Sequence, residues 1–349
     1  MKKRTWFVLI MAFLLIVTGA SGSIFYFQKL EAERAKSDVN KKFKYDNSEE
    51  LVLNIKNRAT LYLSTSQDDY VHMRKQGLSY GNTKENQTTW DIKKDGNKTI
   101  VTIDNKNMQQ RIQPAIFSFG DIYDDSISLG LPENYKKITI KGNNLDISTY
   151  GLILTNLDVE TKYGSVDAND LTTEGLTINS SHGDIYLYDA KIEKDLALNS
   201  TNGNITVEDT SFSNLTAELK NGDMTTGNTK GNLKIDNVSG NTSVNHTKGT
   251  VAINNKNGDI TFHSNQVNYD VSAETVHGNI FIEVDKRSYE RNKVDFSTHL
   301  GVVSIFNENL SSETKFSRDK GVNTIKAVSK NGDINVNELD EDDTEYGND

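Results

Sequence analysis

Acidic residues directly follow glycine at several places in this chain of 349 residues. These positions are Asp184, Asp223, Asp259 and Asp333, and Asn204 and Asn279 occupy the same place in two further copies. Calcium prefers carboxylate and amide oxygens, so a fold that stacked these side chains in register could hold it. The alternative is that they are turn residues that also discourage edge-to-edge pairing of strands. We favour the turn interpretation, because Asn interrupts the series and no Arg or Lys recurs beside it.

Other residue types offer no catalytic or metal-binding pattern. The chain has no cysteine, which excludes disulfides, thiolate zinc sites and cysteine nucleophiles. Of the six histidines, His182 and His277 precede a glycine where Asn stands in other copies, and none shows the i, i+4 spacing of a helical zinc site. No Gly-x-Ser-x-Gly elbow, phosphate-binding loop or dinucleotide fingerprint occurs. We therefore expect neither an enzyme nor a cofactor.

Two tyrosines on one expected strand have a possible binding role. Tyr186 and Tyr188 share the parity of the turn residue, and not that of Ile185 and Leu187, so they should point outward. Exposed aromatic rings of this kind can stack on a sugar. We favour the simpler interpretation that they are ordinary strand surface.

The glycines that precede these polar residues recur at nearly constant spacing. Seven of them are separated by about 18 to 20 residues, and an eighth stands in a final NGDI segment: Gly164, Gly183, Gly203, Gly222, Gly240, Gly258, Gly278 and Gly332. In each unit an alternating apolar run leads into a polar turn at the glycine, and a second run leaves it. Units of equal length with this plan predict a β-solenoid, with glycine supplying a positive φ at the corner. An array of hairpins stays open, because Asn-Gly also suits a two-residue turn that would place Ile253 opposite Phe262.

We divide the chain into five parts from these patterns. Residues 46–145 form a β-rich part, in which TWDIK and TIVTID are joined by KDGN, a tight hairpin signal. Residues 146–337 form the solenoid repeats, and residues 338–349 form an acidic disordered tail. Residues 29–45 are charged and lack Gly and Pro, which predicts a short helical stalk. Residues 1–28 are the cytoplasmic start and the membrane anchor described next.

The N-terminus predicts a membrane anchor. Lys2, Lys3 and Arg4 precede 22 uncharged residues, 6–27, long enough for a helix to cross the bilayer. A cleavable signal peptide is the alternative, with small residues at 18–20. We favour the uncut anchor because the apolar run resumes at 24–27. The positive residues would keep the N-terminus in the cytoplasm and place the rest outside a single-pass cell-membrane protein.

The charge distribution excludes one class of partner. The net charge is −10, and seven acidic residues lie among the last twelve positions. The remaining body is close to neutral and has no basic footprint, so we expect no nucleic acid partner.

The extracellular part, about 46–337, resembles the bacterial putative-adhesin family. The resemblance rests on the opening strands at 51–66, the SLGLP-x-x-Y stretch at 128–135, and the recurrent S/K-x-x-G-[DN]-I units. The layout of anchor, stalk and repeat domain also resembles that of LiaG-like envelope proteins of Gram-positive bacteria, which are encoded with envelope-stress systems. The resemblance implies a right-handed β-helix-like fold and a surface location, and it implies no catalytic residues.

These observations together predict an anchored, non-catalytic β-repeat protein of the cell envelope. We expect it to assist the envelope stress response by binding a wall polymer or a membrane partner. A surface adhesin with an external ligand is one alternative, and a polysaccharide-acting β-helix enzyme is another. The enzyme interpretation requires a carboxylate cluster with a facing Lys or Arg on one solenoid face.

Overall fold

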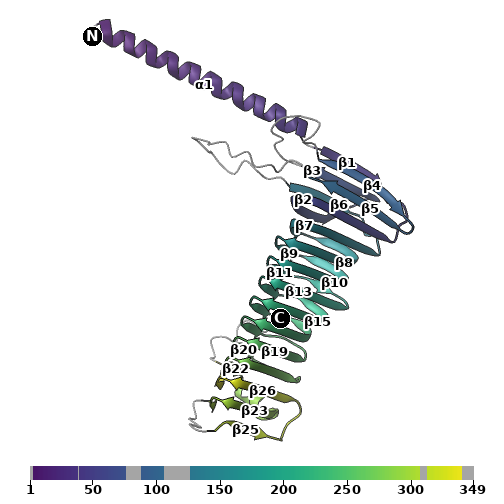
Figure 1. The fold of residues 1–349 in the computed structure, drawn as a ribbon, viewed down its shortest axis with the longest axis vertical. Coiled ribbons are helices and arrows are strands. Elements are labelled where there is room, and N and C mark those ends of the chain that lie inside the picture. The colour runs from purple at the N-terminus through teal and green to yellow at the C-terminus, as the bar shows by residue number, and fades with distance from the viewer. Residues whose placement is uncertain (1–2, 38, 76–87, 106–125, 307–312, 340–349) are drawn as a thin grey trace.

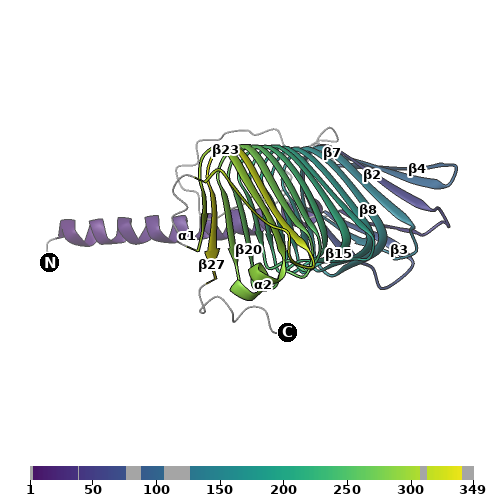
Figure 2. The same cartoon turned by 90° about the horizontal axis from the view of Figure 1, so that it is seen from below.

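The computed structural model describes residues 3–37, 39–75, 88–105, 126–306 and 313–339. Over these residues the chain is an all-β rod of stacked strands with one long helix at its N-terminal end (Figure 1). Figure 2 views the strands from below and shows how successive coils overlie one another. The expected all-β class and the solenoid are therefore confirmed. The right-handed sense of the coil stays a prediction.

From residue 152 onward each coil consists of a long strand, a glycine corner and a short strand. The long strands, in spatial order, are β2 (Glu50–Thr65), β7 (Lys137–Thr149), β8 (Leu152–Tyr163), β10 (Leu171–His182), β13 (Asp195–Asn202), β15 (Ser211–Asn221), β17 (Lys230–Ser239), β19 (Val251–Asn257), β21 (Val271–His277), β26 (Thr324–Asn331) and β23 (Lys293–Leu300). The short strands are β9 (Val166–Asn169), β11 (Ile185–Tyr188), β14 (Ile205–Glu208), β16 (Met224–Gly227), β18 (Thr242–Asn245), β20 (Ile260–Ser264), β22 (Ile280–Val284), β27 (Ile334–Glu338) and β24 (Val303–Ile305), and β12 (Lys191–Ile192) pairs on a third side. β2 and β7 instead continue through the corner as single strands. Neighbouring coils pair in parallel, so the rod grows by about 4.8 Å per coil.

The pairing pattern decides between coils and hairpins in the repeats. Ile253 pairs with Ile235 and Ala273 in parallel register. It does not lie opposite Phe262, which pairs with residues of other short strands. This parallel pairing shows that the hairpin alternative is wrong for the repeats. Because the units have nearly equal length, each apolar side chain stacks on its counterpart in the next coil.

Alternation along each strand builds one continuous core. Leu196 and Leu198 of β13 are buried, and Ile205 and Val207 of β14 are buried after the corner. Because the register is in phase, these side chains form apolar columns through the rod, and burying them is the main stabilising contribution.

Additional strands extend the sheet at the N-terminal end of the stack, some in parallel and others in antiparallel pairing. β5 (Lys98–Asp104) and β6 (Ser126–Leu131) pair in parallel with β2, and β4 (Thr89–Asp95) pairs antiparallel with β5. The expected KDGN hairpin is confirmed, with Gly96 at φ +57°. The helical stalk expected over 29–45 ends at Ser37. The following residues form the strand β1 (Val39–Lys44), which pairs antiparallel with β3 (Tyr70–Lys75) and so hydrogen-bonds the backbone groups along the edge of β3.

The C-terminal coil does not follow sequence order. β26 and β27 insert between the coil of β21 and β22 and the coil of β23 and β24. β23 and β24 therefore form the last coil, and β25 (Lys315–Arg318) covers β23 in antiparallel pairing. The expected acidic tail lies mostly outside the described residues, while Glu338 ends β27.

Two helices accompany the strands. α1 (Lys3–Ser37) has strongly exposed apolar side chains, including Phe13, Ile16 and Phe25. Within the described part of the chain, no helix combines the length and the apolar character needed to cross a membrane. α2 (Lys286–Arg291) is a short connection whose first turn is capped by Asp285, which accepts a hydrogen bond from the Ser288 N–H.

Candidate functional site

The glycine corners bring the backbones of successive coils into contact. At Gly258 the φ angle is +139°, and a Cβ atom would lie 2.0 Å from the carbonyl oxygen of Gly240. No side chain fits this position, because its first carbon would overlap the preceding coil and would also need a backbone conformation that L-residues avoid. The other predicted glycines also have positive φ, and a Cβ atom there would collide with the backbone of a neighbouring coil: Gly164, Gly183, Gly203, Gly222, Gly240, Gly278 and Gly332.

The residues after the glycines form a hydrogen-bonded ladder. The earlier Gly164 is followed by Ser165, but from Gly183 to Gly332 Asp and Asn alternate in spatial order: Asp184, Asn204, Asp223, Asn241, Asp259, Asn279 and Asp333. The Oδ1 atom of each accepts a hydrogen bond from the backbone N–H of the next member, and Asp333 accepts one from Val302 at 2.9 Å. Both residue types supply this acceptor, and alternation keeps two carboxylates from standing on adjacent coils.

This arrangement gives the predicted ladder residues a structural task. Asp184, Asp223, Asp259 and Asp333 lie in one column, and an Asn coil separates each from the next. Over the described residues, no group of three or more His, Cys, Asp or Glu side chains has the geometry to hold a metal ion. Calcium binding at this ladder stays the less favoured alternative, which a melting experiment can test.

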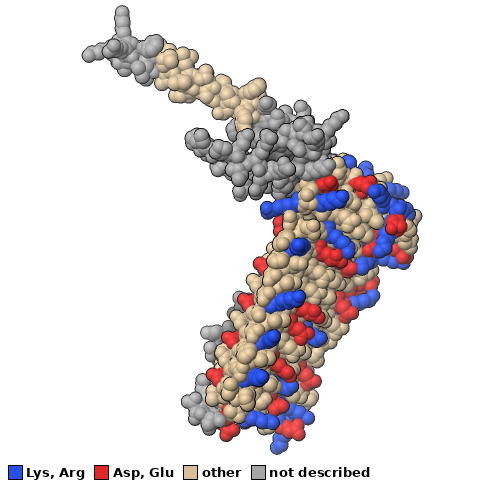
Figure 3. All heavy atoms as spheres, viewed as in Figure 1, with Lys and Arg blue, Asp and Glu red and all other residues tan. Residues whose placement is uncertain are grey.

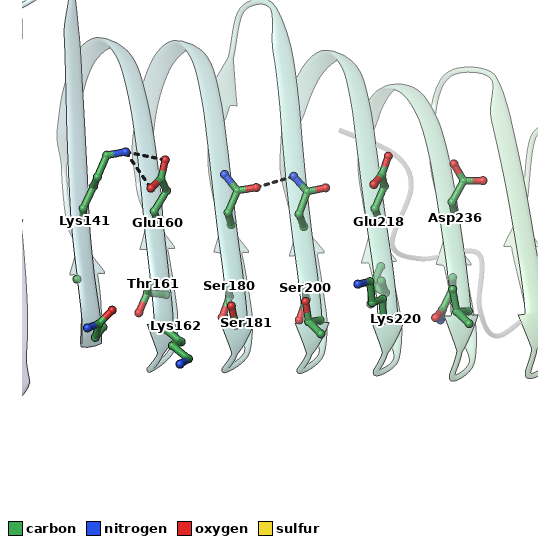
Figure 4. A pocket seen from close by; sticks show the side chains of 18 of the residues that line it. Lys141, Glu160, Thr161, Lys162, Ser180, Ser181, Ser200, Glu218, Lys220 and Asp236 are labelled. Carbon is green, nitrogen blue, oxygen red and sulfur yellow. Dashed lines mark hydrogen bonds and ion pairs between the residues drawn. The ribbon is translucent and has the colours of Figure 1, made fainter.

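A long open groove of about 1300 Å³ runs across the long strands. It extends from β2 to β19 and crosses eight successive strands, with lining residues at 54–57, 141–143, 160–162, 179–181, 199–201, 218–220, 236–238 and 254–256. Figure 4 shows its side chains in rows that repeat from strand to strand. A site of this shape fits an extended ligand better than a compact one.

The first row of the groove carries acids and amides. Lys141 forms an ion pair with Glu160 at 2.9 Å, and Asn199 donates to the Oδ1 atom of Asn179 at 2.7 Å (Figure 4). Further along, Glu218 and Asp236 are direct neighbours in the parallel register. Both side chains face solvent, so this carboxylate pair lacks the burial by which a glycosidase acid retains its proton.

The second row of the groove contains lysines, and from β8 onward it lies two residues before each corner glycine. It includes Lys56, Lys162, Lys220 and Lys256, and the register continues it to Lys330 on β26. Uncharged residues such as Ser181 and Thr201 occupy the coils between them. Basic atoms accordingly recur at intervals down the rod in Figure 3.

The tyrosines and histidines lie outside the groove. Tyr186 and Tyr188 point outward, as parity predicts, and their hydroxyls donate to Asp184 and Glu208. Hydrogen bonding to Asp184 is the main reason that the pKa of Tyr186 is raised. His182 stacks on the ring of Tyr163, with the ring centroids 4.9 Å apart.

Comparison with known families decides the family of the chain. The model of the Toastrack DUF4097 family matches residues 48–241 and 224–337. The chain belongs to the Toastrack DUF4097 family. The resemblance of this Toastrack chain to bacterial putative adhesins is thereby confirmed, while the likeness to LiaG-like proteins stays a prediction.

Several solved structures are similar to this Toastrack chain. A putative adhesin from Bacteroides fragilis is 16% identical, with coverage of 88% of this chain and 99% of that one and a TM-score of 0.42. A putative adhesin from Parabacteroides distasonis is 11% identical, with coverage of 85% and 96% and a TM-score of 0.47. A putative lipid binding protein from the same organism is 14% identical, with coverage of 86% and 96% and a TM-score of 0.43. No curated protein matches the chain.

Sequence reasoning missed the groove of this Toastrack chain, although a signal for its lysines was present. Lysine stands two residues before the glycine in TKYG, LKNG, NKNG and SKNG. The expectation that no Arg or Lys recurs beside the acidic positions did not consider these lysines three residues earlier. Lys220, Lys256 and Lys330 each come three residues before a ladder Asp, and the glycine corner between them turns the chain onto another side of the coil.

Proposed function

We propose that this chain is a non-catalytic surface protein of the bacterial envelope that binds an extended polymer along the groove. The observation that carries the proposal is the repetition of polar side chains across eight stacked strands. A linear polymer presents the same chemical group at regular intervals, and a stack of coils presents its partners at intervals of about 4.8 Å. The ligand we propose is a wall polymer.

Membrane anchoring and a role in the envelope stress response form the finer part of this proposal. The uncharged run at 6–27, which follows three basic residues, supports the anchor. The exposed apolar side chains of α1, such as Phe13 and Phe25, also support it. An anchored rod would hold the groove outside the membrane, where a wall polymer is accessible.

The groove can be tested with two matched substitutions in one coil. Thr201 lines the groove on β13, whereas Thr206 lies on β14 beyond the corner, and both side chains are half-buried. Thr201→Trp should block the groove and lower the binding of full-length protein to purified wall polymers by at least about tenfold. Thr206→Trp should leave binding unchanged. Equal binding by all three proteins would refute the groove as the site.

A surface adhesin is the second candidate, and the names of the solved relatives favour it. Deletion of the gene separates the two functions. An adhesin should lose attachment to external ligands, and a stress accessory should change the response to wall-active antibiotics.

Enzymatic action on a polysaccharide is a third candidate: Glu218 and Asp236 are adjacent, but they lack the burial that keeps a catalytic acid protonated. Release of reducing ends from a polysaccharide by the full chain, abolished in Glu218→Gln, would favour it.

A further inference from the structure

Lysines are spaced regularly along one edge of the groove. Lys162, Lys220, Lys256 and Lys330 occupy equivalent positions on β8, β15, β19 and β26, with Lys330 beyond the end of the groove. Lys56 lies on β2 within a register irregularity at the other end, and we call these five residues the lysine row. Two coils separate most neighbours and three separate Lys162 from Lys220, which corresponds to about 10 and 14 Å. All five side chains are exposed.

These lysines have no acidic partner of their own. Over the described residues, none of the five forms an ion pair, whereas other lysines on the rod do, such as Lys141 with Glu160 and Lys326 with Glu274. Lys162 contacts the face of Tyr163, with Nζ 5.3 Å from the ring centroid. The row is therefore available to a ligand that supplies negative charge.

The carboxylates near the row in sequence form no ion pair with it over the described residues. Glu160 and Glu218 each stand two residues before a lysine of the row, but Glu160 pairs with Lys141. Asp223 and Asp259 each come three residues after a lysine of the row, and each accepts a backbone N–H of the next coil through Oδ1.

Four lysines of the row together with Lys141, and three carboxylates, Glu160, Glu218 and Asp236, line the groove. This is an excess of two positive charges in a chain whose net charge is −10. Most acidic residues of the chain lie outside the groove. The net charge of the groove is therefore positive, whereas that of the chain is negative.

The side chains between the lysines can bind hydroxyl groups. Between Lys162 and Lys220, Ser181 and Thr201 stand in the lysine row itself, and Asn179 and Asn199 stand in the row beside it. Between Lys220 and Lys256 the position is occupied by the apolar Val238. Amides and hydroxyls donate and accept hydrogen bonds, which suits the hydroxyls of a sugar or a polyol. Among the described residues, no aromatic side chain lines the groove, so this part of the chain offers it no stacking platform for nucleic acid bases.

We propose that the ligand is a linear, hydroxyl-rich polyanion, whose phosphate or carboxylate groups contact the lysine row and whose hydroxyls contact the intervening Asn, Ser and Thr side chains. This inference rests on the proposed polymer-binding function and narrows it to an acidic polymer. A membrane surface fits less well, because the row is one lysine wide and lies along a groove.

The test uses full-length protein and four probes of defined chemistry. Polygalacturonate carries charge and hydroxyls, inorganic polyphosphate carries charge alone, dextran carries hydroxyls alone, and oligo(dT) carries phosphodiesters with bases. We expect polygalacturonate to bind most tightly, with an affinity that falls as salt rises. Stronger binding of dextran or of oligo(dT) would overturn the proposal.

Two triple variants with the same charge change complete the test. Lys162→Gln, Lys220→Gln and Lys256→Gln together should weaken polygalacturonate binding at least about tenfold. The control combines Lys191→Gln, Lys230→Gln and Lys248→Gln, exposed lysines on another side of the coil, and should retain the affinity. Equal losses in both triples would show non-specific attraction and overturn the lysine row.

The same measurements separate this inference from the proposed function. If the groove triple binds polygalacturonate as the parent does while Thr201→Trp abolishes binding, the lysine row is refuted and the groove stands. If the parent binds none of the four probes or wall polymers, both fail. Thermal melts of both triples exclude a loss of folding as the cause.

Discussion

The Oδ1 atom of Asp259 accepts a hydrogen bond at 2.7 Å from the backbone N–H of Asn279 on the next coil. Asn279 in turn accepts the N–H of Asp333 at 2.9 Å, although these residues are 54 positions apart in the sequence. The ladder thus continues across the insertion of the C-terminal coil. Its task requires an acceptor oxygen at every coil and a negative charge at none.

Asp259→Asn should therefore change stability little, because the amide retains an acceptor oxygen. Asp259→Ala removes the acceptor and should lower the free energy of unfolding by about 1 kcal/mol. Thermal melts followed by circular dichroism compare the two variants. A large rise in the wild-type melting temperature on adding calcium, absent from Asp259→Asn, would instead establish the calcium ladder.

Asn279→Asp tests why Asp and Asn alternate. This change would place carboxylates on three adjacent coils, each about 4.8 Å from the next. Repulsion at that distance should cost about 1 kcal/mol at low ionic strength and less at high salt. The difference between melting temperatures in low and high salt measures the effect, and Asp259→Asn is the control. Equal melting of Asn279→Asp and wild type in low salt would contradict this explanation.

Gly258→Val should destabilise the rod strongly. The new Cβ atom would lie 2.0 Å from the Gly240 carbonyl oxygen, at a φ of +139°. We expect a loss of about 3 kcal/mol in the free energy of unfolding, measured in urea. Gly227→Ala is the matched control, because its Cβ would make only an ordinary contact, 3.5 Å from the Glu208 side chain. Similar losses of stability in both variants would contradict the role assigned to the positive φ and the close backbone contact at Gly258.

Periodicity explains which parts of the fold the sequence predicts. Equal units and period-two alternation require register between coils, so the core and the corner glycines follow from spacing alone. Periodicity does not predict that β26 and β27 insert between the coil of β21 and that of β23. The strands of every coil have similar alternation, so the sequence does not specify which coil pairs with which. The groove also escaped prediction, because its rows join residues about 19 positions apart that become neighbours only when the coils stack.

The stability of the N-terminal end should fall in acid because of Asp46. Burial alone would raise the pKa of Asp46, but hydrogen bonds from Ser48 and Thr99 and contact with Lys94 outweigh it and lower this pKa to about 2. A lowered folded-state pKa contributes stability above about pH 4, and that stability is lost as the pH falls through about 2. Because Asp46 is partly exposed and solvent screens its interactions, we expect ionised Asp46 to contribute about 1 kcal/mol to the free energy of unfolding. Asp46→Asn should melt lower than wild type at pH 7 and equally at pH 2, and an equal difference at both pH values would contradict this role.

Removal of the inserted coil should expose both coils that it separates. A chain ending at residue 322 lacks β26 and β27, so β21 and β22 lose their parallel partners on one side, and so do β23 and β24. The Gly278 and Gly301 corners would also lose Gly332, which lies between them. We expect faster hydrogen exchange in β22 and β23 and a lower melting temperature. A chain ending at residue 339 keeps every described strand and should behave like the parent. If the shorter chain retained slow exchange in β23, the last coil would have to pair directly with β21, and the insertion would not be needed for stability.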